Sequence, residues 1–513
     1  MNNEKPKKDS PKARNLSKSK LIAFRQCPKR LWLELHRPEL SQVSKGTQAS
    51  FSTGNIVGDI ARQLYDPAGE GALIDPSVEG FRAAFDRTQQ LLRSPKPIFE
   101  AGFSAGGALA FADVMLPVSG GDGHAWRMVE VKSATKVKNY HREDAAIQTH
   151  IAQLAGVRLD AIGLAHIDSS WTYPGNEDYS GLLKEVDLTE VALAKSGEVA
   201  GWIADAQEVA KREDEPNVKP GPQCKDPFEC SFNQYCQSRL PSTQYPISWL
   251  PKQGDRKEMK LLRAQGEVLE MRDVPDDYLS DKQRRVKECT LSSTTYFDIE
   301  RTRALLSTHS LPAYFIDFET TAFVVPIWQG TRPYEAIPFQ FSAHCLSGQG
   351  ELSHRAHLDL SGHDPSSAFA HALLDACGKH GPVFVYNAGF ENGIIKALAA
   401  RFPQISGPLL AICERTVDLL PLAREHYYHP SQHGSWSIKN VLPAVAPDLA
   451  YDELDGVKDG SMAMVAYAEA IDPSTTPGRK EQLEKQLLDY CKLDTFAMIR
   501  LWRVFADRSD IRL

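Results

Sequence analysis

The stretch YFIDFETTAF, residues 314–323, places two carboxylates, Asp317 and Glu319, in a run of apolar residues. Such a run is typical of a buried strand. Side chains alternate between the faces of a strand, so Asp317 and Glu319 point to one face and Phe318 to the other. Two partly buried like charges repel each other unless a positive charge lies between them. The stretch therefore predicts either a divalent metal site or a strand end with both carboxylates in water.

Two later segments contain acidic residues that can complete a metal site. The segment VFVYNAGFENGIIKAL is expected to form a strand that ends at Asn387, followed by a helix with Glu391 in its first turn. The segment QLEKQLLDYCKLDTFAMIRLWRVF has the apolar periodicity of a long helix, and Asp494 falls within its apolar stripe. Tyr490 lies one turn before Asp494 on the same face. A buried aspartate needs a partner, so these residues are candidates for the same site.

In chain order, these motifs resemble those of the DEDD exonucleases, in the subgroup with a tyrosine in its last motif. The resemblance covers residues 311–505 and implies an RNase H-like (DnaQ-type) domain over residues 311–513. It also implies two Mg²⁺ or Mn²⁺ ions and a water oriented or deprotonated by Tyr490. The implied metal ligands are Asp317, Glu319, Glu391 and Asp494, although the family normally has Asp where Glu391 stands.

The same resemblance assigns roles around this site. Asn387 and Phe390 match a substrate-side Asn-x-x-Phe turn of the family. Asp418 in ERTVDLL matches an accessory acidic position, and a helix cap is an equal alternative. Arg332, Tyr334 and Gln340 follow the first metal strand closely, and we expect them to face nucleic acid through phosphate contacts and base stacking.

Further along the chain, the aromatic segment HYYHPSQHGSWSIKN, residues 426–440, is expected to line the substrate, with a metal site as the alternative.

An earlier pair of strand-like runs predicts a second candidate site. Asp113 lies in FADVML, and Glu130 and Lys132 share one face of MVEVKS. Carboxylates on neighbouring strands can hold Mg²⁺ or Mn²⁺, and Lys132 can orient or deprotonate a water or stabilise developing charge. The same alternation also occurs on solvated strand faces.

The surrounding segments resemble the PD-(D/E)xK nucleases, in the branch that contains RecB-type and Cas4-type enzymes. LSKSKLIAFRQCPKRLWL, with Ser17 as N-cap, is similar to the first helix of that branch, and HREDAAIQTHIAQLAG is similar to the helix after the Glu-x-Lys strand. The resemblance covers residues 16–240 and implies a restriction-endonuclease-like core in which Gln148 contributes to substrate binding. Glu100 matches a further acidic position. The early histidine of many members has no counterpart, and GNIVGDIAR offers only Asn55 or Asp59.

Four cysteines fit a metal centre in this first domain. Cys224, Cys230 and Cys236 are spaced six residues apart, which fits poorly with the short ligand spacing of zinc ribbons. In the nuclease branch that the segment resembles, one cysteine before the core and three after it hold a [4Fe–4S] cluster. Cys27 and the triplet match that arrangement, and Zn²⁺ is the alternative. The other five cysteines are expected to be small core residues.

Length and composition are consistent with this division. A chain of 513 residues is too long for one ordinary core, so we expect a two-domain α/β protein. Residues 1–15 read as a disordered basic tail and residues 241–310 as a partly helical linker. No apolar run is long enough to span a membrane, no secretory signal is seen, and the odd cysteine count suggests a reducing cytoplasm. The net charge of −7 argues against a wholly basic nucleic-acid binder.

The order of domains resembles an uncharacterised bacterial family in which a RecB/Cas4-like nuclease precedes an exonuclease-like domain. The resemblance implies a metal-dependent nuclease, with DNA favoured over RNA as substrate, in DNA repair or in defence against foreign DNA. A nucleic-acid-binding scaffold with one or both sites degenerate is the alternative. The sequence indicates nothing about protein partners.

Overall fold

The computed structural model describes residues 15–42, 45–118, 125–252, 257–265, 270–449 and 451–511 of a mixed α/β protein with several sheets. Its contacts divide the chain into two compact units, Met1–Leu240 with Phe323–Tyr334, and Pro241–Ala322 with Glu335–Leu513. Residues 1–14 of the predicted basic tail lie outside the described residues. Within the described ranges, no helix is long and apolar enough to cross a membrane.

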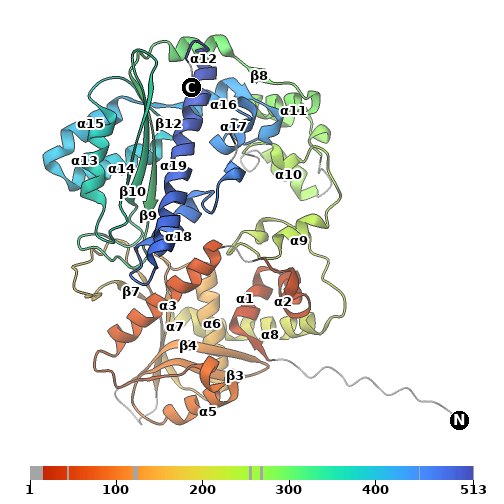
Figure 1. Ribbon diagram of the computed structural model, residues 1–513. Coiled ribbons are helices and arrows are strands. Elements are labelled where there is room, and N and C mark those ends of the chain that lie inside the picture. Colours follow the sequence, from red (N-terminus) through yellow and green to blue (C-terminus); the bar gives the residue numbers. More distant parts are fainter. Residues whose placement is uncertain are drawn as a thin grey trace. The chain divides into compact units, whose positions relative to one another are not determined.

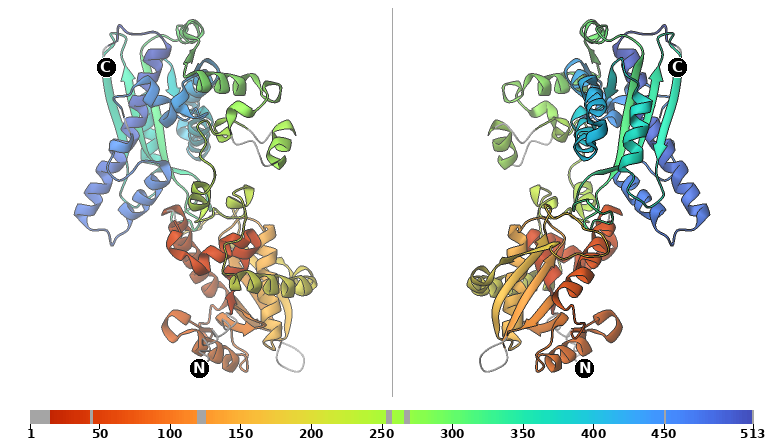
Figure 2. Two further views of the ribbon diagram at one scale, coloured as in Figure 1. Left: turned by 90° about the vertical axis from the view of Figure 1, so that its right-hand side faces the viewer. Right: turned by 90° about the vertical axis from the view of Figure 1, so that its left-hand side faces the viewer.

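The first unit is built on a seven-stranded mixed sheet (Figures 1 and 2). Its strand order is β2-β3-β4-β5-β6-β7, and β1 pairs with β4. Strands β3, β4 and β5 are antiparallel neighbours, whereas β5 and β6 are parallel and are joined by the crossover helix α6. The strands are β1 (Leu16–Ser17), β2 (Ala72–Leu73), β3 (Ile98–Ala105), β4 (Ala108–Pro117), β5 (Trp126–Lys132), β6 (Leu159–Ile167) and β7 (Leu183–Asp187).

Helices pack on the main core face of this sheet. The buried cluster joins Met128 of β5 to Ile147 of α6 and Leu21 of α1, and Ser17 caps α1 as predicted. The opposite face of β5 carries Val129 and Val131, which confirms the predicted alternation about Glu130 and Lys132. The helices are α1 (Lys18–Gln26), α2 (Pro28–His36), α3 (Lys45–Tyr65), α4 (Pro76–Glu79), α5 (Phe81–Leu91), α6 (Asn139–Leu154), α7 (Thr189–Ala194), α8 (Ser196–Lys211) and α9 (Asn233–Ser238).

A segment distant in sequence completes the first unit. Residues Phe323–Tyr334 belong to it, although they follow β9 and precede β10 in the chain. Val324 and Val325 pack against a cluster that contains Val57 and Ile60 of α3. The backbone of Tyr173 exchanges hydrogen bonds with Gly330 and Thr331. The first unit therefore requires chain that lies beyond residue 240.

The second unit is built on a five-stranded sheet with strand order β11-β10-β9-β12-β13. Strands β11, β10 and β9 are antiparallel, whereas β9, β12 and β13 are parallel. A separate two-stranded sheet pairs β14 with β8. The strands are β8 (Tyr296–Phe297), β9 (Ala313–Thr321), β10 (Ile337–Leu346), β11 (Leu352–Leu358), β12 (Val383–Val385), β13 (Thr416–Asp418) and β14 (Tyr427–Tyr428).

Both faces of the five-stranded sheet are covered by helices (Figure 1). On β9, Phe315 packs with α19, whereas Ile316 and Phe318 pack with α13 and α14 on the other face. In Figure 2, the blue helices α18 and α19 run beside each other along this sheet. The helices are α10 (Lys257–Gln265), α11 (Asp281–Ser292), α12 (Ile299–Leu306), α13 (Ser366–Cys377), α14 (Ala388–Arg401), α15 (Ser406–Glu414), α16 (Leu419–His426), α17 (Ile438–Val445), α18 (Gly460–Ile471) and α19 (Pro477–Phe505).

Residues 241–310, which we expected to form a linker, are part of the second unit. Leu250, Met259 and Val286 are buried in the same core cluster as Phe315. Trp249 stacks on His433 with ring centroids 3.9 Å apart, and Thr290 hydrogen-bonds to Tyr428. Sparse apolar residues in this charged segment therefore dock it onto the second unit.

Candidate functional site

Two elements of the second unit, β9 and α19, bring acidic side chains together beside its sheet. Strand β9 supplies Asp317 and Glu319 on the face that α19 covers, and α19 supplies Asp494 and Tyr490. Glu319, Asp494 and Tyr490 are all less than 8% exposed. One carboxylate oxygen from each of Asp317 and Glu319 lies within 4.8 Å of the other and of Sγ of Cys491. The predicted grouping of β9 with the apolar stripe of α19 is therefore present.

The negative charges of these carboxylates repel one another. Burial raises the pKa of Asp317 well above its ordinary value, and Asp494, Glu319 and Glu391 raise it further. Burial and the charge of Asp494 raise the pKa of Glu319 to about 8. Burial also raises the pKa of Asp494 to about 6, against hydrogen bonds from Tyr451 and Tyr490 and the charge of Lys439. The site thus favours a bound cation or retained protons.

Glu391 is positioned by a tight turn at the start of α14. Asn387 has a left-handed backbone with φ +95°, and its N–H donates to Asp418, as does that of Ala388. Asp418 also caps α16, so it acts both as a helix cap and as an anchor of the turn. Glu391 is 2% exposed, and within the described part of the chain its Oε2 has no hydrogen-bond partner. Burial raises the pKa of Glu391 to about 8.

Two groups beside these acids were not predicted from the sequence. The hydroxyl of Tyr451 donates to Oδ1 of Asp494. Lys439, on α17, lies 5.0 Å from the ring centre of Tyr490 and 5.1 Å from that of Tyr451, and its Nζ is 3.3 Å from the Tyr490 hydroxyl. Burial and the neighbouring carboxylates raise the pKa of Tyr490, so its phenol is a proton donor in this structure.

Three aromatic residues of the segment 426–440 belong to the core of the second unit. Tyr427, Tyr428 and Trp436 are buried, and the indole of Trp436 donates to the carbonyl of Tyr427. Its contribution to the acidic site is Lys439.

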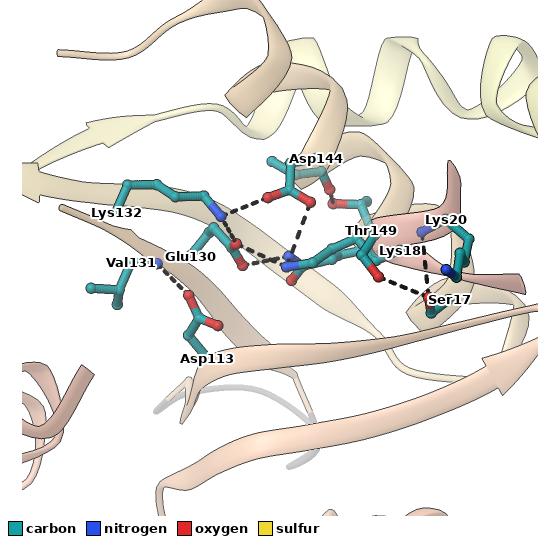
Figure 3. Close-up of polar contacts among 12 residues, drawn as sticks. Ser17, Lys18, Lys20, Asp113, Glu130, Val131, Lys132, Asp144 and Thr149 are labelled. Atoms are coloured by element: carbon teal, nitrogen blue, oxygen red, sulfur yellow. Dashed lines mark hydrogen bonds and ion pairs between the residues drawn. The ribbon is translucent and has the colours of Figure 1, made fainter. Parts of the chain in front are cut away.

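The first unit places its predicted residues around a cavity of about 740 Å³. Asp113, Glu130 and Lys132 line it, and Oδ2 of Asp113 accepts the N–H of Val131 at 2.7 Å (Figure 3). Burial and the charge of Glu130 raise the pKa of Asp113. The geometry thus groups the two carboxylates and the lysine that the Asp…Glu-x-Lys pattern predicted.

Glu100 and the two polar residues offered by α3 also line this cavity. Strand pairs Phe99–Val114 and Ala101–Ala112 flank Glu100 and Asp113 on neighbouring strands. Glu100 has φ +54°, which is unfavourable for a residue with a Cβ and is typical of functional positions. Asn55 and Asp59 lie on the lining, where the resemblance left a histidine without counterpart.

Two lysines neutralise Glu130, which is 1% exposed. Lys132 pairs with Oε1 of Glu130 and, at 2.7 Å, with Asp144. Lys18 pairs with the same Glu130 oxygen at 2.9 Å and lies 3.5 Å from Asp144 (Figure 3). Burial alone would raise the pKa of Glu130, but Lys132 and Lys18 outweigh it and lower that pKa. Lys18 and Asp144 were not recognised from the sequence.

The residues predicted to bind substrate have different environments. Gln148 is fully buried and donates to Oε2 of Glu130, so it holds a carboxylate instead of facing substrate. Gln340 is also buried and donates to the carbonyl of Leu487. Arg332 and Tyr334 are exposed but belong to the first unit, where the Tyr334 hydroxyl donates to the carbonyl of Ser133.

Phe390 on α14 is 40% exposed, and Asn387, the residue before α14, is exposed as well. Both remain accessible to a ligand.

The four predicted cluster cysteines line one small cavity of the first unit. Cys27 lies between α1 and α2, and Cys224, Cys230 and Cys236 come from the segment 222–238. Gln26 donates to the carbonyls of Gln223 and Phe228, both at 2.7 Å, and ties the two segments together. All nine cysteines are free thiols, and burial raises the pKa of Cys236 to about 11. Four convergent thiols are a donor set that fits iron or zinc.

Comparison with known proteins adds a partial family match. A domain of unknown function, DUF2779, matches residues 314–437, which include Asp317, Glu319 and Glu391. The search of curated proteins found no match. A solved structure titled "Crystal structure of SSO0001" is 14% identical, with a TM-score of 0.23, and the alignment covers 46% of this chain and 91% of that chain. A likeness at this TM-score does not establish a shared fold.

The raised carboxyl pKa values predict how the stability of the metal-free protein depends on pH. Between about pH 5 and pH 8, folded Glu319 retains a proton that the unfolded chain has released, so stability falls as the pH rises. The Gln side chain of Glu319→Gln does not titrate. The free energy of unfolding of this variant should therefore fall by about 1–3 kcal/mol less than that of the wild type over this pH range. Urea unfolding in a chelator at several pH values measures the effect. Glu481→Gln, at an exposed position of α19, is the matched control, and parallel curves for wild type and Glu319→Gln would contradict the prediction.

Proposed function

We propose that this protein is a cytoplasmic metal-dependent nuclease with a PD-(D/E)xK-type first unit and a DEDD-type, RNase H-like second unit. The observation that carries the proposal is the set of four acids, the half-buried Asp317 and the buried Glu319, Glu391 and Asp494, with Tyr490 beside them. One lysine, Lys439, supplies one positive charge, which is less than four carboxylates require. The free Oε2 of Glu391 and the oxygen-rich donor set fit Mg²⁺ or Mn²⁺.

In this proposal, bound divalent metal would polarise the phosphodiester and stabilise the charge that develops on its oxygens. Asp317, Glu319, Glu391 and Asp494 would hold it. Tyr490 would orient the attacking water through its hydroxyl, since its raised pKa keeps the phenol protonated. The exposed Phe390 ring offers a surface on which a base can stack.

The first unit supports a second hydrolytic site. Asp113, Glu130 and Glu100 offer carboxylate oxygens to a divalent metal on the wall of one cavity. Lys132 is held as an ammonium by Asp144 and Glu130, and its charge would stabilise the phosphorane-like state. We favour DNA over RNA as the substrate, and DNA repair or defence against foreign DNA as the setting, by analogy with the families that the motifs resemble.

The two units are tested separately by substitution. We expect Mg²⁺- or Mn²⁺-dependent cleavage of labelled single- or double-stranded DNA. Asp317→Asn should lower the cleavage activity of the second unit by at least about 100-fold, and Lys132→Ala should lower that of the first unit by as much. Asp489→Asn on the exposed face of α19 and Lys184→Ala on β7 are the matched controls. Binding of nucleic acid without cleavage by the wild type on any DNA or RNA would favour a scaffold with degenerate sites.

The cysteine cluster has its own test. We propose a [4Fe–4S] cluster that braces the first unit, with Zn²⁺ as the alternative. Protein purified without oxygen should be brown and contain iron and sulfide, and Cys230→Ser should lose both, together with thermal stability. Cys413→Ser, in the second unit, should retain them. Stoichiometric zinc without iron would establish the alternative, and metal content unchanged by Cys230→Ser would exclude this site.

A further inference from the structure

Lys18 occupies a helix position that is locally unfavourable for a cation. It is the first residue of α1, where the unpaired N–H groups of the helix carry partial positive charge. The first turn of α1 contains no acidic residue that would offset this repulsion. A residue that breaks a local rule needs a compensating interaction elsewhere in the fold.

The backbone that carries Lys18 is held in place. Leu16 and Ser17 form β1, which pairs in parallel with Ala108 and Leu109 of β4, the strand that also carries Asp113. The Ser17 side chain then caps α1 by accepting the N–H of Lys20. The backbone of Lys18 is therefore fixed in position beside the first site.

Its ammonium contacts the proposed metal ligand Glu130 and the carboxylate of Asp144, which also pairs with Lys132. Nζ of Lys18 lies 2.9 Å from Oε1 of Glu130 and 3.5 Å from Oδ1 of Asp144 (Figure 3). Lys132 contacts the same Oε1, and Gln148 donates to Oε2. Both oxygens of Glu130 are thus engaged in this structure.

The same two lysines also lie between two cavities of the first unit. Lys18 and Lys132 line the cavity of about 740 Å³ that contains Asp113 and Glu100. They also line a neighbouring cavity of about 930 Å³, which contains Arg30 and Phe232. The ion pairs of these lysines therefore form part of the wall between the cavities.

We propose that Lys18 is a positioning residue that competes with the divalent metal for Glu130. Without metal, Lys18 and Lys132 balance the buried charges of Glu130 and Asp144. A divalent metal held by Asp113 and Glu130 would take the place of the Lys18 ammonium at Oε1 of Glu130. Lys18 therefore weakens metal binding at the first site and makes occupancy depend on metal concentration. This inference rests on the proposed function of the first unit.

Metal affinity tests the inference without relying on cleavage. Mn²⁺ binding is measured by calorimetry on the full chain in an Asp317→Asn, Glu319→Gln background, so that the first site dominates the signal. Lys18→Met should bind Mn²⁺ at least about tenfold more tightly, because it removes one positive charge beside the ligand. Lys18→Gln provides a second neutral variant. Lys20→Met, on the same helix but paired with Glu34, is the matched control and should leave the affinity unchanged.

The outcomes separate the inference from the proposed function. Tighter binding in either neutral Lys18 variant, lost again when Asp113→Asn is added, supports the competition. Equal or weaker binding in a folded Lys18 variant overturns it but leaves an Asp113-dependent metal site intact. Absence of Asp113-dependent binding in every variant overturns both the metal site of the first unit and the role of Lys18.

Discussion

The acidic site of the second unit depends on the free-energy cost of burying negatively charged side chains. Asp317, Glu319, Glu391 and Asp494 lie where water solvates them poorly, which raises the pKa of each, and the charge of Asp494 raises the pKa of Asp317 and of Glu319 further. A fold does not retain such an arrangement for stability, since apolar side chains of similar volume would fill the same space at lower cost. The fold nevertheless holds Glu391 in this group through the turn at Asn387, whose backbone has φ +95° and whose N–H donates to Asp418. The divalent metal that we propose for this site would account for both the burial and the repulsion.

In the first unit, lysine side chains offset the cost of burying carboxylates. Glu130 and Asp144 are balanced by two lysines, so the pKa of Glu130 is lowered, in contrast to the raised values in the second unit. The pKa values of Asp113 and Glu100 are raised, because burial and the charge of Glu130 outweigh the charges of the lysines. Without metal, lysines thus balance Glu130 and Asp144 of the first site, whereas most acids of the second site retain protons instead. If both sites hold metal, we expect their metal affinities to respond differently to substitution of neighbouring lysines.

Local periodicity predicted the parts of these sites that lie on regular elements. The two-residue period of β9 placed Asp317 and Glu319 on the α19 face, and the apolar stripe of α19 placed Asp494 opposite them. The same rule applied to α6 would have found Asp144, which lies four residues before the buried Gln148. Lys18 and Lys439 reach their carboxylates only through tertiary packing, so no spacing in the sequence indicates them. The charged composition of residues 241–310 masked the few apolar residues, such as Met259 and Val286, that dock this segment onto the core. The exchange of Phe323–Tyr334 into the first unit is likewise invisible to local patterns.

We propose that the acids Asp317, Glu319, Glu391 and Asp494 of the second unit hold divalent metal. Anomalous diffraction from crystals of the full chain grown with Mn²⁺ tests it most directly. We expect anomalous density between β9 and α19 in contact with Asp317, Glu319 and Asp494, which is lost in Asp317→Asn. Density absent from this position at saturating Mn²⁺, with Asp494 still bonded to Tyr451 and Glu391 unliganded, would contradict it.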